Sequence, residues 1–263
     1  MKKPKIALAL GGGSARGLAH LGVLKVLEKH NIPIHIIAGT SIGAIVGSLY
    51  AKEKDTNKLE ELAVITNNRR VISLLDFSFQ SGLISGKKIM NYLKEELQGE
   101  TFKDLKIPLI IVSTNLKTGE PVYFHKGNLL TAIRASISIP LVFSPVIYNK
   151  QILVDGQLSE PVPVSAALSQ GADIVIAVNL DSEERMSKDI KPSFKEVANK
   201  TTKILLYQLS KSNSEKADVV ISPGLDYRSS ISFSEAKNFI KKGEQAAEKQ
   251  IPKIKALIKN FKA

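Results

Sequence analysis

Short apolar runs alternate with longer segments of helical pattern along the chain. Buried strands are expected at six runs: Lys5 to Leu10, Ile34 to Ala38, Leu109 to Thr114, Gln151 to Val154, Ile174 to Val178 and Val219 to Ser222. Helical spacing of apolar residues predicts helices at residues 15–30, 41–52, 57–66, 86–97, 128–136, 162–170, 195–212 and 233–260. Strands that alternate with helices predict a mostly parallel sheet covered on both faces, a three-layer α/β/α fold.

No shift in composition divides the chain, so we expect one domain over residues 1–263. The most polar stretch, Asp181 to Lys195, has the composition of a surface loop. The C-terminal helix at residues 233–260 is basic, and its apolar residues fall near one face: Ile240, Ala247, Ile251, Ile254, Ile258 and Phe261. Two interpretations fit this pattern: a helix packed on the sheet with a solvated lysine face, or a helix on a membrane surface.

The chain is basic, with 37 lysines and arginines against 25 acidic residues and a formal net charge of +12. Such a charge favours anionic partners. Nucleic acid is the weaker candidate, because the chain has no Trp, only 6% aromatic residues and no arginine-rich or zinc-binding pattern. A solvated lysine surface and peripheral contact with an anionic membrane both remain open.

Cysteine is absent, which excludes disulfides, thiolate metal sites and cysteine catalysis. No apolar run of the sequence reaches the roughly 18 residues that span a bilayer. The run Ile6 to Leu10 follows a basic start, but it is too short for a signal peptide. We therefore expect the mature protein to begin here and to be cytoplasmic, with any membrane contact peripheral.

The sharpest chemical signal is Gly39-Thr-Ser-Ile-Gly43, a G-x-S-x-G pentapeptide between an apolar strand and a helix. That context is the one a nucleophile elbow requires, with Ser41 in an exposed, tight turn at the carboxyl end of the strand. Gly39 and Gly43 would come close together across the turn, where side chains would clash. The alternative is an ordinary glycine-rich turn in which Ser41 caps the helix.

A second glycine-rich loop, Gly11 to Gly17, also follows a strand and opens a helix, where N–H groups form an anion site. A P-loop needs Gly-Lys-Ser/Thr, and a Rossmann fingerprint needs an acidic residue at the end of the next strand; neither is present. An oxyanion hole beside Ser41 is favoured, because adjacent strands bring both loops to one sheet edge. Arg16 either supports the loop, attracts an anionic headgroup or lies on the helix surface.

A nucleophilic serine needs a base. We expect structural or surface positions for all four histidines: His20, His30, His35 and His125. Asp155 ends a strand and precedes Gly156, so its carboxylate can leave the sheet and face the elbow. An aspartate is a weak base unless it is held close to the serine and desolvated. A Ser–Asp dyad and an ordinary Asp-Gly turn both remain open.

Four motifs in one order are distinctive. They are Leu10-Gly-Gly-Gly-Ser-Ala-Arg-Gly-Leu-Ala-His-Leu-Gly-Val-Leu24, Ala38-Gly-Thr-Ser-Ile-Gly-Ala44, Arg134-Ala-Ser-Ile-Ser-Ile-Pro140, and Leu153-Val-Asp-Gly-Gln157 followed by Pro161-Val-Pro-Val164. With these motifs the chain resembles the bacterial patatin-like phospholipases, of the small type similar to the catalytic domain of neuropathy target esterase. The resemblance covers residues 5–225, which we expect to form the core of the domain.

The resemblance implies a catalytic dyad, with Ser41 as nucleophile and Asp155 as base. It implies an oxyanion hole from backbone amides of the glycine loop, at Gly11, Gly12, Gly13 and Ser14. It also implies five supporting motif residues: Arg16, Gly17, Gly39, Gly43 and Gly156. The implied activity is hydrolysis of carboxylic ester bonds in phospholipids or lysophospholipids through an acyl-enzyme, with a lipid ester as partner and no metal or organic cofactor.

Two positions depart from the family's motifs. Ser14 stands where the glycine motif has glycine, and serine is strained there if the position has positive φ. Gln157 stands where the family has glycine or alanine, and its side chain either narrows the site or points away. Two alternative functions remain: a non-catalytic regulator that binds lipid or protein, and a nucleotide- or nucleic-acid-binding protein. The lipid, hydrolysis against acyl transfer, and the oligomeric state stay open.

Overall fold

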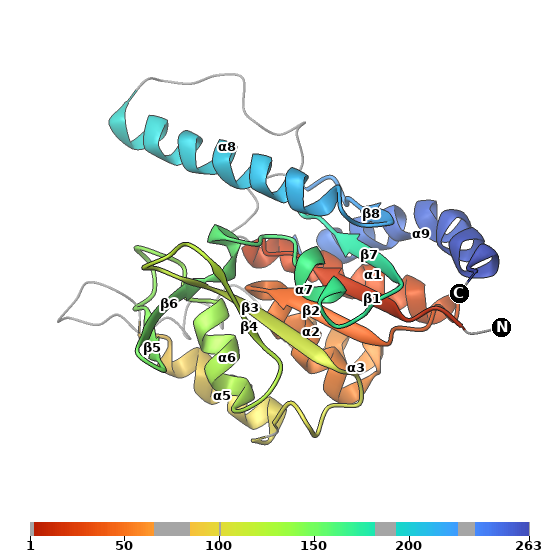
Figure 1. Ribbon diagram of the computed structural model, residues 1–263, viewed down its shortest axis with the longest axis horizontal. Helices are drawn as coiled ribbons and strands as arrows, with labels where there is room; N and C mark the ends of the chain where they lie inside the picture. Colours follow the sequence, from red (N-terminus) through yellow and green to blue (C-terminus); the bar gives the residue numbers. More distant parts are fainter. Residues whose placement is uncertain (1–2, 66–84, 100, 182–192, 226–234, 263) are drawn as a thin grey trace.

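The computed structural model describes residues 3–65, 85–99, 101–181, 193–225 and 235–262. A sheet of eight strands lies between helices (Figure 1). The strands are β1 Ile6–Leu10, β2 Ile36–Thr40, β3 Leu109–Asn115, β4 Pro121–Phe124, β5 Val146–Tyr148, β6 Gln151–Asp155, β7 Ile174–Val178 and β8 Val219–Ile221. The helices are η1 Ser14–Leu18, α1 Ala19–Lys29, α2 Ile42–Glu53, α3 Thr56–Ile65, α5 Lys87–Leu97, α6 Leu129–Ser136, η2 Gly156–Leu158, α7 Val164–Leu168, α8 Phe194–Ser214 and α9 Ala236–Asn260, with η marking 3-10 turns.

The sheet is parallel in its centre and antiparallel at one end. Its order is β5-β6-β3-β2-β1-β7-β8, with β4 also paired to β3. The pairs β1–β2, β1–β7, β2–β3 and β7–β8 are parallel, as predicted. The pairs of β4 and β6 with β3, and of β5 with β6, are antiparallel. The sequence pattern missed β4 and β5, which are only four and three residues long, shorter than the apolar runs that predicted the strands at the centre of the sheet.

The two faces of the sheet have different side chains and different covers. On β1, Ile6, Leu8 and Leu10 point into the larger apolar core, which contains residues of α1, α2, α6 and α9. Ala7 and Ala9 point to the other face, where the smaller core includes residues of α7. Small alanines on that face let α7 pack close to the backbone of the sheet. The predicted three-layer α/β/α arrangement is confirmed, with the larger core on the α1 side.

The C-terminal helix α9 packs along α1 rather than presenting its apolar face outward (Figure 1). Ile240, Ile251 and Ile254 are buried in the larger core. Two glycines permit the close approach: a Cβ on Gly22 would collide with the Ile240 carbonyl, and one on Gly243 with the Ala19 carbonyl. The packed-helix interpretation is therefore the one the structure supports for this face.

Predicted element positions differ from the observed ones in a few places. The second strand was expected at Ile34 to Ala38 but lies two residues later, because its register starts where Ile36 pairs with Ala7. The first helix begins as the 3-10 turn η1, directly after the glycine loop. In the expected loop Asp181 to Lys195, residues 182–192 lie outside the described part of the chain. Among the described residues, no helix is long and apolar enough to cross a membrane.

Candidate active site

Ser41 occupies a sharp turn between β2 and α2, with φ 55° and ψ −120°. Its side chain does not cap α2, so the alternative of an ordinary capping serine is not what the structure shows. A Cβ on Gly39 would lie 2.5 Å from the Gly43 carbonyl oxygen, and one on Gly43 would collide with the Leu10 carbonyl. The two glycines therefore permit the tight strand–turn–helix geometry, as the sequence predicted. The turn was expected to be exposed, but Ser41 is buried, with 4% of its surface accessible.

Asp155 reaches Ser41 from the opposite direction along the sheet. β2 pairs with β3 as far as Val112, and β6 pairs with β3 from Ser113 onward. Because β4 occupies the other side of β3, β2 and β6 share one side and meet end to end. The sequence correctly placed Asp155 at a strand end. That strand, β6, is antiparallel to β3, and its carboxyl end points toward the turn that holds Ser41. Gly156 allows the meeting, since a Cβ there would collide with the Val112 carbonyl.

The Ser41 hydroxyl donates a hydrogen bond of 2.6 Å to Oδ2 of Asp155. The other carboxylate oxygen, Oδ1, accepts the backbone N–H of Gln157 at 2.9 Å. Burial raises the pKa of Asp155 to about 7, although both hydrogen bonds act in the opposite direction. The carboxyl group is thus held against the serine and desolvated, which makes it a stronger base than an exposed aspartate.

Ser136, at the end of α6, holds the elbow in place. Its Oγ accepts the backbone N–H of Ser41 at 2.8 Å and donates to the Val112 carbonyl at 2.6 Å. One buried hydroxyl therefore ties the turn to β3 beside the point where β2 and β6 meet. Ser136 lies in the Arg134 to Pro140 motif, but sequence reasoning gave it no role. Its contacts join segments far apart in the chain, so spacing alone carries no signal for them.

The glycine loop offers fewer free donors than the four residues expected for it. The N–H of Gly11 donates to the Val178 carbonyl, and the N–H of Gly12 donates to the Pro161 carbonyl. Within the described residues, no acceptor is recorded for the N–H groups of Gly13 and Ser14. Of the four backbone N–H groups expected to form the oxyanion hole, only those of Gly13 and Ser14 therefore have no acceptor among the described residues and are free to donate to a ligand.

Arg16 and His20 hold the carbonyls of this loop. Arg16 is buried and donates to the carbonyls of Gly13 and Leu180 and to the Asp181 carboxylate. Because C=O and N–H point opposite ways in a trans peptide, fixing the Gly13 carbonyl turns the Ser14 N–H away from Arg16. Of the three interpretations of Arg16, loop support is the one these contacts show.

His20, His30 and His35 have hydrogen bonds that give them structural roles, as the sequence predicted. Burial lowers the pKa of His20 to about 4, so the neutral ring contacts the Gly11 carbonyl through Nε2 at 2.7 Å. His35 accepts the N–H of Ile6, and His30 contacts Glu248. Among the described residues, no histidine hydrogen-bonds to Ser41 or Asp155.

The two departures from the family's motifs both lie at the site. Ser14 has φ 54°, so the strain expected of a non-glycine residue is present. The Gln157 side chain lies over Gly12, where a Cβ would collide with its Cγ and Cδ. The side chain therefore lies against the glycine loop and does not point away from it. Gly17 supports the loop from behind, because a Cβ there would collide with Ile42, the residue after the elbow serine.

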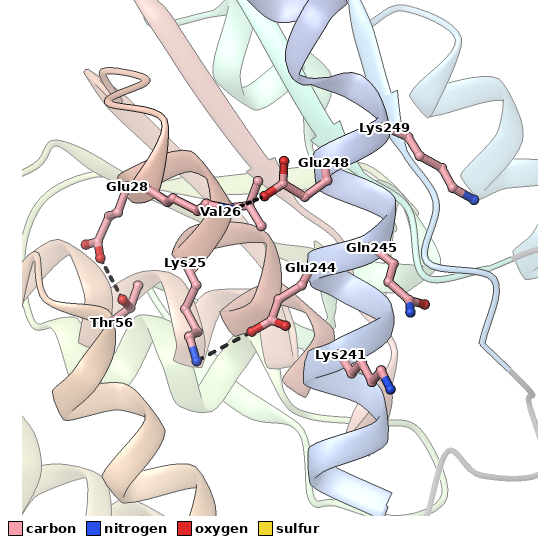
Figure 2. A pocket seen from close by; sticks show the side chains of 10 residues that line it. Lys25, Val26, Glu28, Thr56, Lys241, Glu244, Gln245, Glu248 and Lys249 are labelled. Atoms are coloured by element: carbon pink, nitrogen blue, oxygen red, sulfur yellow. Dashed lines mark hydrogen bonds and ion pairs between the residues drawn. The ribbon is translucent and has the colours of Figure 1, made fainter.

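A charged groove between α1 and α9 lies away from these residues (Figure 2). Lys25 pairs with Glu60 and Glu244, and Glu248 pairs with Lys29 and His30. These side chains neutralise one another at the surface, and the groove contains neither Ser41 nor Asp155. Within the described ranges, no group of three His, Asp or Glu side chains is placed to hold a metal ion.

The strand–turn–helix turn at Ser41 and its buried aspartate have the geometry expected of a nucleophile elbow on an α/β fold. Comparison with known families narrows the identification. Residues 8–168 match the family model described as "Patatin-like phospholipase". The chain belongs to the patatin-like phospholipase family, as its motifs predicted.

Curated relatives agree with the family. The chain is 36% identical over 192 residues to "Uncharacterized NTE family protein Rv1063c" of Mycobacterium tuberculosis, covering 72% of this chain and 53% of that protein. It is 32% identical over 186 residues to human "Patatin-like phospholipase domain-containing protein 6", covering 68% of this chain and 14% of that protein. "Lysophospholipase NTE1" of Meyerozyma guilliermondii is also 32% identical, over 182 residues, with 67% and 13% covered. The chain thus spans about half the length of the mycobacterial relative and a small part of the others.

Solved structures share the fold at low sequence identity. VipD from Legionella pneumophila aligns with a TM-score of 0.61 and 12% identity, covering 95% of this chain and 67% of that one. The type III effector protein ExoU aligns with a TM-score of 0.56 and 14% identity, covering 96% and 53%. These similarities show the fold alone.

Proposed function

We propose that this protein is a serine lipid acyl hydrolase that cleaves carboxylic ester bonds of phospholipids or lysophospholipids. The observation that carries the proposal is the 2.6 Å hydrogen bond from Ser41 Oγ to a buried Asp155. Membership of the patatin-like phospholipase family and the similarity to a protein named lysophospholipase support a lipid ester as substrate.

In the first half of the proposed mechanism, Asp155 takes the Ser41 proton as Oγ attacks the ester carbonyl carbon. The N–H groups of Gly13 and Ser14 donate to the oxygen that becomes negative. Asp155 then returns the proton to the leaving alcohol or lysolipid, and an acyl-enzyme remains on Ser41. In the second half, Asp155 takes a proton from water, the water oxygen attacks the acyl carbon, and the fatty acid leaves as Ser41 regains its proton.

Lipid hydrolysis by variants tests the proposal. Ser41→Ala removes the nucleophile and should reduce fatty acid release from phospholipid and lysophospholipid micelles to background. Asp155→Asn removes the base and should reduce the rate by about 10³-fold or more, within the range reported for removing one member of a catalytic unit. Free fatty acid is measured directly.

Ser48→Ala is the matched control. Ser48 is a buried serine on α2, seven residues after Ser41, and its hydroxyl donates within its own helix to the Ala44 carbonyl. Its variant should keep near wild-type rates. Full lipid hydrolysis by Ser41→Ala would contradict the proposal, and so would a folded wild type that releases no fatty acid from any of these lipids.

A further inference from the structure

A row of exposed apolar side chains crosses the antiparallel end of the sheet. Ile147 on β5 pairs directly with Ile152 on β6. The N–H of Leu116, just beyond β3, donates to the Ile152 carbonyl, which brings Leu116 to the other side of Ile152. The three side chains are exposed by 79%, 44% and 53% in the order Ile147, Ile152, Leu116. We call these residues the edge row.

Isolated exposed apolar residues are ordinary, but three that lie side by side across neighbouring chain segments are not. Cross-strand partners have their Cβ atoms about 5 Å apart, so the edge row forms one continuous apolar strip. Its neighbours Leu153 and Val154 on β6 are buried, so the strip lies beside the core and not within it. Exposing such a strip to water costs free energy, which an apolar partner would recover.

Lysines stand at both ends of the edge row. Lys117 follows Leu116 directly, and Lys150 lies in the turn that joins β5 to β6; both are exposed. The turn is tight, with positive φ at Asn149 and Lys150, so Lys150 is held close to Ile147 and Ile152. Apolar side chains flanked by lysines match the chemistry of an anionic lipid surface, where acyl chains lie beneath negative headgroups.

The edge row lies near the candidate active site along β6. Ile152 precedes Asp155 by three residues on the same strand, a distance of about 10 Å at roughly 3.3 Å per residue. The loop before β5 covers the same stretch, because its Ser138 carbonyl accepts the Asp155 N–H and its end joins Val146, which pairs with Leu153. Leu141 on this loop is 93% exposed. Leu141 therefore adds an exposed apolar side chain on the loop that contacts Asp155.

We propose that the edge row, with Lys117, Lys150 and Leu141, docks the protein on an anionic lipid bilayer and brings the ester to Ser41. The inference rests on the proposed function for its substrate. A second copy of the chain is a poorer occupant, since two edge rows face to face would also bring their like-charged lysines together. Figure 1 shows β5 and β6 at one end of the molecule, with α9 and both termini toward the other.

Vesicle sedimentation in a Ser41→Ala background tests docking without turnover. The probes are phosphatidylcholine vesicles with and without phosphatidylglycerol. Ile147→Ser with Ile152→Ser should weaken binding to the anionic vesicles about tenfold or more. Lys117→Ala with Lys150→Ala should weaken it about fivefold per lysine and leave binding to neutral vesicles unchanged. The lysine variant keeps both isoleucines. It therefore tests the same surface even if the isoleucine variant fails to fold.

Matched controls come from α7 and α9, outside the edge row. Leu168→Ser removes a side chain that is 43% exposed at the end of α7, and Lys253→Ala with Lys259→Ala removes two lysines of α9. Both should bind vesicles like the parent. Equal binding by the edge-row variants and the parent would overturn the inference, and so would loss of binding in the α9 variant alone. A dimer dispersed by the edge-row changes, with vesicle binding intact, would also overturn it.

Activity separates this inference from the proposed function. With Ser41 restored, the edge-row variants should hydrolyse a soluble short-chain ester at the parent rate but lose activity on anionic vesicles. If the parent binds vesicles through the edge row yet cleaves no ester, the docking surface stands and the proposed function fails. If esters are cleaved and the edge row has no effect on vesicles, the docking inference alone fails.

Discussion

Asp155 is subject to two opposing influences at the residue scale. Burial raises the pKa of its carboxyl group to about 7, whereas the bonds from Ser41 and from the Gln157 N–H favour the charged form. The proposed mechanism needs the charged form, so the protein keeps an ionisable group where ionisation is costly. Such a cost at a functional site should appear as lost stability.

Replacing Asp155 by asparagine should therefore stabilise the fold at high pH. The folded-state pKa lies above the ordinary value near 3.8, so the folded protein holds the proton more tightly than the unfolded chain. Wild-type stability should fall as the pH rises from about 4 to about 7 and then level off. The Asp155→Asn variant lacks this loss, and at about pH 8 its melting temperature should exceed that of wild type by about 2–4 °C for each kcal/mol of stability that the wild type has lost.

Thermal melts at several pH values check this prediction. Asp173→Asn is the control, because Asp173 lies at the surface, where its carboxylate accepts the N–H of Lys5. That variant should not reproduce the pH-dependent gain. A melting-temperature difference between Asp155→Asn and wild type that shrinks with rising pH would contradict the assigned direction of the Asp155 pKa.

At the scale of elements, the site exists because β2 and β6 meet end to end on one side of β3. The sequence predicted the elbow, since strand, glycines and helix are neighbours in the chain. It also placed Asp155 at a strand end. It did not predict the antiparallel direction of β6, nor the contact between Ser136 and the elbow. Both depend on contacts between segments about 40 to 95 residues apart, which local patterns do not encode.

Loss of the Ser136 hydroxyl should slow the chemistry without removing any group that touches the substrate. In Ser136→Ala the buried N–H of Ser41 loses its acceptor, which costs about 1–3 kcal/mol and releases the elbow from β3. We expect the rate of Ser41 labelling by a fluorophosphonate to fall about tenfold or more, with the same pH midpoint. Ser136→Thr keeps the hydroxyl and should restore much of the rate.

Ser48→Ala again serves as the control, because it removes a buried hydroxyl that does not contact the elbow. A role limited to folding would lower the melting temperature of Ser136→Ala and leave the labelling rate of its folded fraction unchanged. That outcome would contradict the positioning role.

At the scale of the whole molecule, α9 closes the larger core against α1. Gly22→Ala should destabilise the protein by about 3 kcal/mol, because its Cβ would meet the fixed carbonyl of Ile240 rather than a movable side chain. Gly47→Ala is the control on α2, where the nearest atom is a methyl group of Ile37 at 3.0 Å. Urea unfolding compares the two variants, and equal stabilities would contradict the close α1–α9 crossing.

The layered architecture was the most predictable feature, because the spacing of apolar residues along the chain distinguishes buried strands from amphipathic helices. The role of the basic C-terminal helix was less predictable. The apolar stripe of α9 is compatible with packing against the core and with binding to a membrane surface. Its contacts with α1 distinguish the two. The edge row gave no sequence signal, because Leu116, Ile147 and Ile152 become neighbours only through strand pairing.

The central claim is that Asp155 activates Ser41, and fluorophosphonate labelling across pH tests it most directly. Intact mass should show one adduct on wild type and none on Ser41→Ala. The labelling rate should rise with pH through a midpoint near 7, the pKa of Asp155, because only the carboxylate accepts the serine proton. Asp155→Asn should label far more slowly and without that midpoint. Labelling at another residue, or Asp155→Asn labelling at the wild-type rate, would contradict the account.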